Sequence, residues 1–419
     1  MCIRDSLRGG YGIFYSMVSN NTTFRGTVDT FNAVTAYRGT NDNGATVFTT
    51  LADPFPSGLK TPVGSSAGLM ASVGDSISFL DLKRRSPYNQ QWQMSIQREF
   101  PLRILAEVAY VGMLSLKNVE SFNLNEKPDP YLALGAAENA SVANPLFGLI
   151  DPASSLGGSR TFPQGRLWVR FPQFTTVTIQ GVNTNRTVYH AFQAKLDKRL
   201  SHGLNVILAY TMSRLMDNHM TSLVNERHYR AVSQYDQKHV MRMAFVYQLP
   251  GRFSGPGWNR LLDGALGGWR LSGHLKYTTG QPLSVTHANG RPIRLRSPKL
   301  SGNTGDRLGD RRDAAGNVIN PFFDINAFQP LPTQYMVTPE PPYLDDLRAP
   351  TLFFTNFQLF KAFRVVERLK LEFSFQADNA FNSPQWAAPG ANMSNRATFG
   401  VINDATDART VMTSLRLRF

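Results

Sequence analysis

Hydrophobic and polar side chains alternate through the last nine residues of the chain. One face is mainly apolar and ends in an aromatic residue; its members are Val411, Thr413, Leu415, Leu417 and Phe419. The other face holds Met412, Ser414, Arg416 and Arg418. Because successive side chains of a strand point to opposite faces, this period of two predicts a half-buried β-strand with water on one side.

The same alternation recurs along the chain and predicts an all-β protein with about ten strong strands. We expect these strands at residues 7–17, 90–100, 102–112, 187–200, 204–214, 238–250, 268–280, 351–363, 368–379 and 409–419. Two classes of protein fit such a pattern: a soluble β-sandwich, for example one that binds carbohydrate, and a transmembrane β-barrel.

The connections between the predicted strands favour the barrel. Long connections, rich in Gly, Pro, Asn, Asp and Ser, span residues 18–89, 113–186, 215–237, 281–350 and 380–408, and they alternate with shorter ones. A sandwich gives no reason for this alternation, whereas outer-membrane barrels have short periplasmic turns and long extracellular loops. The pattern therefore predicts a transmembrane antiparallel up-and-down β-barrel whose last strand ends in the periplasm.

The two faces of the predicted strands carry different side chains. On the polar face we expect residues that line the barrel lumen: Lys195, Arg270, His274, Lys276, Glu372, Arg416 and Arg418. On the other face we expect an interfacial aromatic girdle of Trp92, Tyr110, Tyr210, Trp269 and Tyr277. Glu372 is expected either to pair with Arg416 or Arg418 on the neighbouring strand, or to be hydrated.

Composition excludes several other classes. Hydrophobic residues make up 42% of the chain, and mean hydropathy is −0.26. No stretch approaches the roughly 20 continuous apolar residues that a transmembrane helix needs. The net charge of +14 comes from 44 basic and 30 acidic residues, but the basic residues are dispersed and form no reader motif. We therefore expect no nucleic-acid partner.

The first six residues fit nothing that follows them. They include the single cysteine, Cys2, which excludes a disulfide within the chain, and they show no apolar segment of a signal peptide. We interpret residues 1–6 as a non-native junction and residues 7–419 as the C-terminal part of an outer-membrane barrel. Its signal peptide is then expected upstream.

Catalytic and metal motifs have no support in their sequence context. Residues 64–68 match G-x-S-x-G around Ser66, but no helical pattern follows, as a nucleophile elbow requires. The seven histidines show no metal-ligand spacing, and Asp306, Asp310 and Asp313 lie among arginines that compete for their carboxylates. We therefore expect no enzyme activity, no catalytic residue, no metal and no cofactor.

Eleven short segments supply a further signal. They are residues 8–15, 86–92, 97–101, 107–112, 189–193, 198–204, 209–214, 235–239, 267–269, 280–282 and 379–382. Each is weak alone, but the ordered set covers nearly the whole chain. It resembles the β-barrel of TonB-dependent receptors, specifically the Oar-like group.

The resemblance implies a barrel of roughly 22 strands, of which this chain holds the C-terminal part with about ten. It also implies energised uptake of a large or scarce nutrient through a barrel closed by a plug domain. The plug and the TonB box lie outside this sequence. The alternative is a non-transporting outer-membrane surface barrel, such as an adhesin or a matrix-binding protein.

Several partners follow from the resemblance. The barrel wall is expected to contact outer-membrane lipid and lipopolysaccharide, and the long loops an extracellular ligand of unknown identity. The barrel-assembly machinery is expected to read the last strand, where Leu415, Leu417 and Phe419 would serve assembly and closure. The TonB complex is expected to engage the missing N-terminal region.

Overall fold

Ten long strands dominate the structure, a computed structural model that describes residues 5–16, 46–56 except 48, 58–250 except 153, 267–366 except 339, and 369–419. The isolated residues 33, 35, 37 and 39 are also described. The expected junction at residues 1–6 and the first long loop therefore lie partly outside the described residues. Most of the link between residues 250 and 267, and part of the expected short turn at residues 365–367, do so as well.

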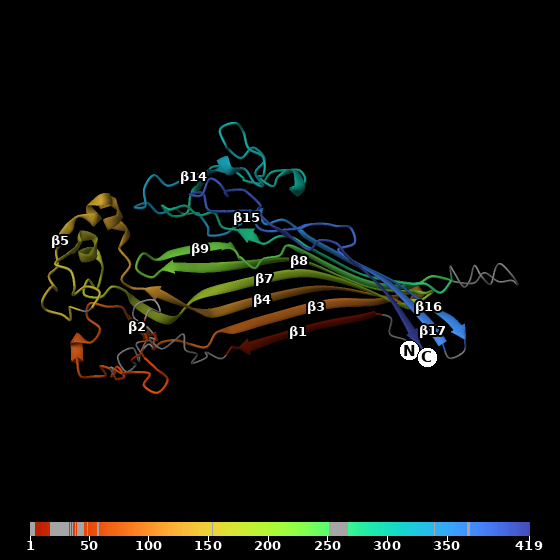
Figure 1. Ribbon diagram of the computed structural model, residues 1–419, viewed down its shortest axis with the longest axis horizontal. Helices are drawn as coiled ribbons and strands as arrows, with labels where there is room; N and C mark the ends of the chain where they lie inside the picture. Colours follow the sequence, from red (N-terminus) through yellow and green to blue (C-terminus); the bar gives the residue numbers. More distant parts are fainter. Residues whose placement is uncertain are drawn as a thin grey trace.

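The long strands form one antiparallel sheet in which each strand pairs with the next long strand along the chain (Figure 1). In sheet order they are β1 (Asp5–Tyr15), β3 (Tyr88–Phe100), β4 (Ile104–Asn123), β7 (Val177–Ser201), β8 (Leu204–Ser222), β10 (His239–Gln248), β11 (Arg270–Thr278), β16 (Leu352–Val366), β17 (Leu369–Asp378) and β20 (Thr410–Arg418). All ten predicted strands are thus confirmed, and so is the up-and-down topology.

Short elements occupy the connections between the long strands. The strand β2 (Ile77–Leu80) pairs in parallel with β7, and β9 (Arg227–Val232) pairs with β8. The other short strands are β5 (Ser141–Ala143), β6 (Thr161–Pro163), β12 (Pro282–Leu283), β13 (Ile293–Arg294), β14 (Phe328–Gln329), β15 (Leu344–Arg348), β18 (Gln385–Trp386) and β19 (Ala405–Thr406). The 3₁₀ helices are η3 (Gly68–Met70), η4 (Pro101–Arg103), η5 (Asp129–Asn139), η6 (Gln164–Trp168), η7 (Thr304–Asp306) and η8 (Ile325–Ala327).

Three strands continue well beyond their predicted ends. β4 has 20 residues, β7 has 25 and β8 has 19, so parts of the expected loops 113–186 and 215–237 are strand. The β4–β7 pairing shifts register several times beyond Ser115, which obscures the period of two in the sequence. Pairing in these extensions satisfies backbone groups that a loop would leave to water.

A tight hairpin between β7 and β8 shows how the short turns form. His202 and Gly203 both have positive φ, at 51° and 75°, as a two-residue turn of the hairpin type requires. A Cβ at Gly203 would lie 2.4 Å from the carbonyl oxygen of Gln248 on the next strand. Glycine is therefore needed there for both conformation and space.

The register divides the sheet into two chemically distinct faces. Directly opposed residues of antiparallel strands lie on the same face. One row on what we call the apolar face joins Tyr210, Met241, Tyr277 and Phe353 across β8, β10, β11 and β16. The neighbouring row, on what we call the polar face, joins Ala209, Arg242, Lys276 and Phe354. The alternation predicted from sequence thus extends across strands as well as along them.

Most of the buried apolar residues lie in the connections between the long strands. Phe323, Ala327 and Leu347 are 1%, 0% and 2% exposed. They belong to a cluster, which we call the loop core, of Val285, Phe323, Ala327, Phe328, Leu344, Leu347 and Phe399. Residues 281–350 and 380–408 were expected to be long extracellular loops. They pack on each other instead, because they carry enough aromatic and aliphatic side chains to exclude water.

The sheet has two edges, β1 and β20, which do not pair with each other in the described structure. The apolar face of β20 is exposed, with Leu415 at 66%, Leu417 at 54% and Phe419 at 98%. Barrel closure is therefore not seen within the described residues. Among those residues, no helix combines the length and the apolarity that crossing a membrane demands.

Candidate functional site: the polar face and a pocket among the long connections

The seven charged residues predicted to line a lumen share the polar face. Register places Lys195 on β7, three of them on β11, Glu372 on β17 and two arginines on β20 along that face. Arg270 lies over the Phe360 ring at 4.6 Å, and Lys276 lies over Phe354 at 5.3 Å. Their role as lumen-lining residues stays a prediction.

The expected pairing of Glu372 is found. Arg416 is its direct cross-strand neighbour, but the ion pair forms on the diagonal, where Arg418 Nη1 donates to Glu372 Oε1 at 3.4 Å. Arg418 is 72% exposed, so this pair contributes little to stability.

A hollow of about 390 Å³ opens on the polar face of β7, β8 and β10. Its wall includes Tyr189, Gln193, Thr211 and Arg242, which are side chains able to hydrogen-bond water or a passing solute. The polar face of the sheet is thus its hollowed side in this region.

Register places four of the five predicted girdle residues on the apolar face, and Trp269 contacts the rings of Phe363 and Phe373 on that face. Two of the five share a detail that the sequence did not predict. The hydroxyl of Tyr110 is 2.7 Å from Nδ1 of His190, and that of Tyr210 is 2.8 Å from Nδ1 of His239. Each histidine ring also stacks on its tyrosine ring, with centroids 6.1 Å apart. These pairs join an apolar ring to a polar tip, as suits a membrane–water boundary.

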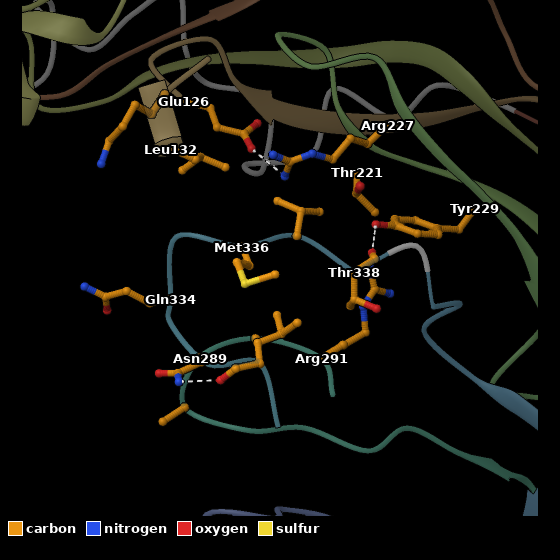
Figure 2. A pocket seen from close by; sticks show the side chains of 15 residues that line it. Glu126, Leu132, Thr221, Arg227, Tyr229, Asn289, Arg291, Gln334, Met336 and Thr338 are labelled. Carbon is orange, nitrogen blue, oxygen red and sulfur yellow. Dashed lines mark hydrogen bonds and ion pairs between the residues drawn. The ribbon is translucent and has the colours of Figure 1, made fainter. Parts of the chain in front are cut away.

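A larger pocket lies among the long connections (Figure 2). This loop pocket has a volume of about 570 Å³, and it is lined by residues of the β4–β7 connection, of the β8–β9 hairpin and of residues 288–338. Such a volume falls in the range of small-molecule sites. Segments far apart in the sequence therefore meet around one cavity.

Two of the three cations that line the loop pocket are already neutralised. Arg227 pairs with Asp129 and also with Glu126, at 3.3 Å from Nη1 to Oε1. Lys127 pairs with Glu138, and burial lowers the pKa of this lysine. These pairs brace the wall that the β4–β7 connection contributes, and they place three carboxylates against two cations.

Arg291 differs from these two cations. Its guanidinium carbon lies 4.3 Å from the ring centroid of Tyr229, and no carboxylate of the described residues lies within ion-pair distance of it. Tyr229 is 9% exposed and donates from its hydroxyl to the carbonyl oxygen of Thr338 at 3.1 Å. A fixed aromatic ring thus supports the half-buried Arg291 from one side and leaves its N–H groups without an acidic partner.

The rest of the pocket lining is mixed in character. Leu132, Leu331, Met336 and Val337 give an apolar wall. Asn289 donates from Nδ2 to the carbonyl oxygen of Leu331 at 2.8 Å, which leaves its side-chain oxygen as an acceptor. An apolar wall with a few placed polar groups is the usual composition of a ligand site.

An ion-pair network anchors the segment that supplies much of this pocket. Asp236 is 1% exposed, accepts from the backbone N–H of Leu215 at 2.6 Å, and pairs with Arg348 at 2.7 Å. Arg348 also pairs with Asp345 at 2.6 Å, and Asp345 pairs with Arg214 at 3.4 Å. The network ties β15 to β8 and to the β9–β10 connection.

Residues of the excluded catalytic and metal motifs make local hydrogen bonds. Ser66 donates to the carbonyl oxygen of Val63 within a turn, and no cluster of three or more metal-ligating side chains occurs in the described part of the chain. Hydrogen bonds from Asn320 and Asn317 lower the pKa values of Asp310 and Asp313, which act as turn-forming residues.

The loop pocket was missed by sequence reasoning. Arg227, Tyr229 and Arg291 have no common spacing, and their meeting depends on contacts between distant segments. The only local signal was residues 235–239, where Asp236 lies in a segment of the resemblance. Its burial and its partner Arg348 were not predictable from that segment.

An up-and-down sheet with one apolar face, one polar face and long connections that alternate with short ones is typical of an outer-membrane barrel wall. The chain belongs to the outer membrane beta-barrel domain family, whose sequence model matches residues 4–412. The match confirms the predicted class and the location in the bacterial outer membrane. A comparison with curated proteins found none that matches this sequence.

Several solved structures are similar to the chain. The ferripyoverdine receptor of the outer membrane of Pseudomonas aeruginosa bound to ferripyoverdine is 10% identical, over 80% of this chain and 28% of that chain, with a TM-score of 0.36. The outer membrane transporter YddB from Escherichia coli is 11% identical, over 83% and 35%, with a TM-score of 0.38. The FrpB iron transporter from Neisseria meningitidis is 11% identical, over 81% and 32%, with a TM-score of 0.35. The chain thus spans about a third of the length of these receptors and transporters.

Proposed function

We propose that this chain is part of a TonB-dependent receptor of the Oar-like group, which imports a nutrient too large or too scarce for porins. The observation that carries the proposal is the loop pocket, which has the size and mixed lining of a ligand site and lies among the long connections. In this reading the long connections face the outside of the cell, the polar face lines the lumen, and the apolar face contacts lipid.

The remaining partners follow from the same reading. The girdle of Trp92, Tyr110, Tyr210, Trp269 and Tyr277 would lie at the lipid headgroups of the outer membrane, including lipopolysaccharide. The exposed strand β20 would be read by the barrel-assembly machinery through strand addition. The TonB complex would act on a plug and a TonB box encoded outside this sequence.

Energised uptake separates this proposal from a non-transporting adhesin or matrix-binding barrel. The test compares the native bacterium with a deletion of the full-length gene and with its complemented strain. Each receives labelled peptides, glycans and ferric chelates too large for porins. We expect accumulation of one class to need the gene and to stop when a protonophore is added. Surface binding that depends on the gene, without accumulation of any class, would instead identify a surface barrel.

A further inference from the structure

We propose that the loop pocket binds an oxyanion of its ligand, a carboxylate or a phosphate, through Arg291, with the ligand's apolar part on Leu132, Leu331 and Met336. This inference rests on the proposed function, because it names the chemical class of ligand for the same pocket.

One cation of the cavity wall has no carboxylate partner. Lys127 and Arg227 have carboxylate partners, whereas Arg291 has none among the described residues that surround the pocket. A half-buried guanidinium has lost part of its hydration, so an anion that enters the cavity gains a charge-assisted hydrogen bond at a reduced cost of desolvation. Arg291 is therefore the group in this cavity with the most to gain from an anionic ligand.

The contact with Tyr229 favours a fixed orientation of the Arg291 side chain. The ring of Tyr229 covers one face of the guanidinium, and the tyrosine itself is held by its hydrogen bond to Thr338. A stacked guanidinium presents its donors at its edge, where a carboxylate or phosphate is bound by two parallel hydrogen bonds. In Figure 2 Arg291 and Asn289 lie on the same segment, with Arg291 on the side toward Tyr229. The amide oxygen of Asn289 lies on the same wall and would accept a donor of the ligand.

The apolar wall of the loop pocket further restricts the chemical class of its ligand. Leu132, Leu331 and Met336 come from two different connections and line the same cavity as Arg291. A fully hydrated inorganic anion would gain nothing from these side chains, whereas an anion with an aliphatic or aromatic body would bury that body on them. The expected ligand is thus an amphipathic acid and not a free inorganic anion.

The test uses the purified full-length gene product in nanodiscs, with hexanoate, hexyl phosphate and the neutral hexanamide as probes in calorimetric titration. We expect both anions to bind at least tenfold more tightly than hexanamide. Arg291→Ala is expected to remove this preference, and Arg291→Lys to retain part of it. Arg296→Ala is the matched control, because Arg296 lies five residues away and pairs with Asp324. It is expected to change affinity less than twofold.

Three results would overturn the anion site: failure of both anions to bind, equal binding by hexanamide, or unchanged anion binding in Arg291→Ala. A loss of binding in both Arg291→Ala and Arg296→Ala would also overturn it, since it would reflect overall charge. Displacement of hexyl phosphate by purified lipopolysaccharide would assign the anion to a lipid headgroup and overturn a soluble ligand. Anion binding without gene-dependent uptake would refute transport while leaving this site intact.

Discussion

Lys361 lies over the indole ring of Trp269, with its ammonium nitrogen 5.4 Å from the ring centroid. The lysine is 4% exposed, and it donates to the carbonyl oxygen of Gly267 at 2.6 Å. It belongs to the apolar face, because its cross-strand neighbour is Phe373. The ring of Phe363 lies on the same ammonium at 4.9 Å. A charge on the apolar face is thus enclosed by aromatic rings near the short-turn end of the sheet.

This enclosure makes Lys361 a stabilising residue despite its position. We expect Lys361→Ala in the full-length protein to lower the free energy of unfolding by about 1–2 kcal/mol, because a desolvated cation–π contact is lost. Lys361→Arg should retain most of the stability. Urea unfolding in liposomes, followed by tryptophan fluorescence, measures the change. Lys370→Ala is the control, since Lys370 is exposed on the polar face and is expected to change stability by less than about 0.5 kcal/mol. Equal effects of the two alanine variants would contradict the role of the rings.

Asp236→Ala is expected to release the segment that carries β15. Removing one partner of a buried ion pair costs about 3–5 kcal/mol, because Arg348 is left without its deepest carboxylate. Hydrogen exchange should show faster exchange in residues 340–350 and unchanged exchange in β10 and β11. Glu372→Gln, which breaks an exposed pair, is the control and should leave both regions protected. Uniform loss of protection across the sheet would mean that Asp236 supports the whole wall.

The packing of residues 340–350 on the sheet is expected to weaken at acid pH. Burial would raise the pKa of Asp345, but the hydrogen bond from Arg348 and the charges of Arg348, Arg214 and Lys238 outweigh it and hold the pKa below its usual value. A carboxyl with a lowered folded pKa contributes stability above its unfolded pKa and loses it as pH falls through the folded pKa. The protection factors of the amides in residues 340–350, which correct for the intrinsic pH dependence of exchange, should therefore stay constant down to about pH 4, the ordinary range of aspartate, and fall below it. Asp345→Asn should flatten this response; a fall that begins near neutral pH would exclude Asp345 as its cause.

Asn379 is expected to be essential for joining the ends of β17 and β20. Its φ is +46°, and its side chain donates to the carbonyl oxygens of Ser383 and Asp407 and accepts from the N–H of Ser383 at 2.9 Å. Asn379→Ala should cost about 1–3 kcal/mol through unsatisfied buried groups, and somewhat more because alanine disfavours this φ. Asn379→Gly keeps the backbone relaxed but loses the hydrogen bonds, so it should lie between alanine and the native protein. A glycine variant as stable as the native protein would assign the whole effect to the backbone.

Gly273→Val should destabilise the sheet through its aromatic neighbours. A Cβ at Gly273 would lie 2.5 Å from the ring of Phe245 and 2.7 Å from that of Phe357, which cover the glycine from both adjacent strands. Overpacking of this kind costs about 1–3 kcal/mol. Gly10→Val is the matched control, because no atom lies within 4 Å of a Cβ at that strand glycine. Phe245→Ala should restore part of the stability of Gly273→Val; failure of this rescue would contradict ring overlap as the cause.

The predictable part of this fold is local. Tyr210 and Tyr277 were assigned to one face from the alternation alone, and the register places both in one row of the sheet, because a strand preserves a period of two whatever its neighbours are. The enclosure of Lys361 was not predicted, since a single charge in an apolar row has no periodic signal. Arg291 and Tyr229 lie on separate connections, and only the folding of both connections brings them together. Pairwise contacts between distant loops leave no pattern in either segment.

The loop core and the apolar face of the sheet are stabilised by different forces, because they would be surrounded by different solvents. Phe323, Ala327 and Leu347 are driven together by water, whereas the apolar face of the sheet would be dissolved in hydrocarbon and is held by backbone pairing. Cooling weakens the first of these forces far more than the second. On cooling, the packing of the loop core would therefore weaken while the strand pairing of the sheet stays intact. A change of temperature alone would thus change access to the loop pocket.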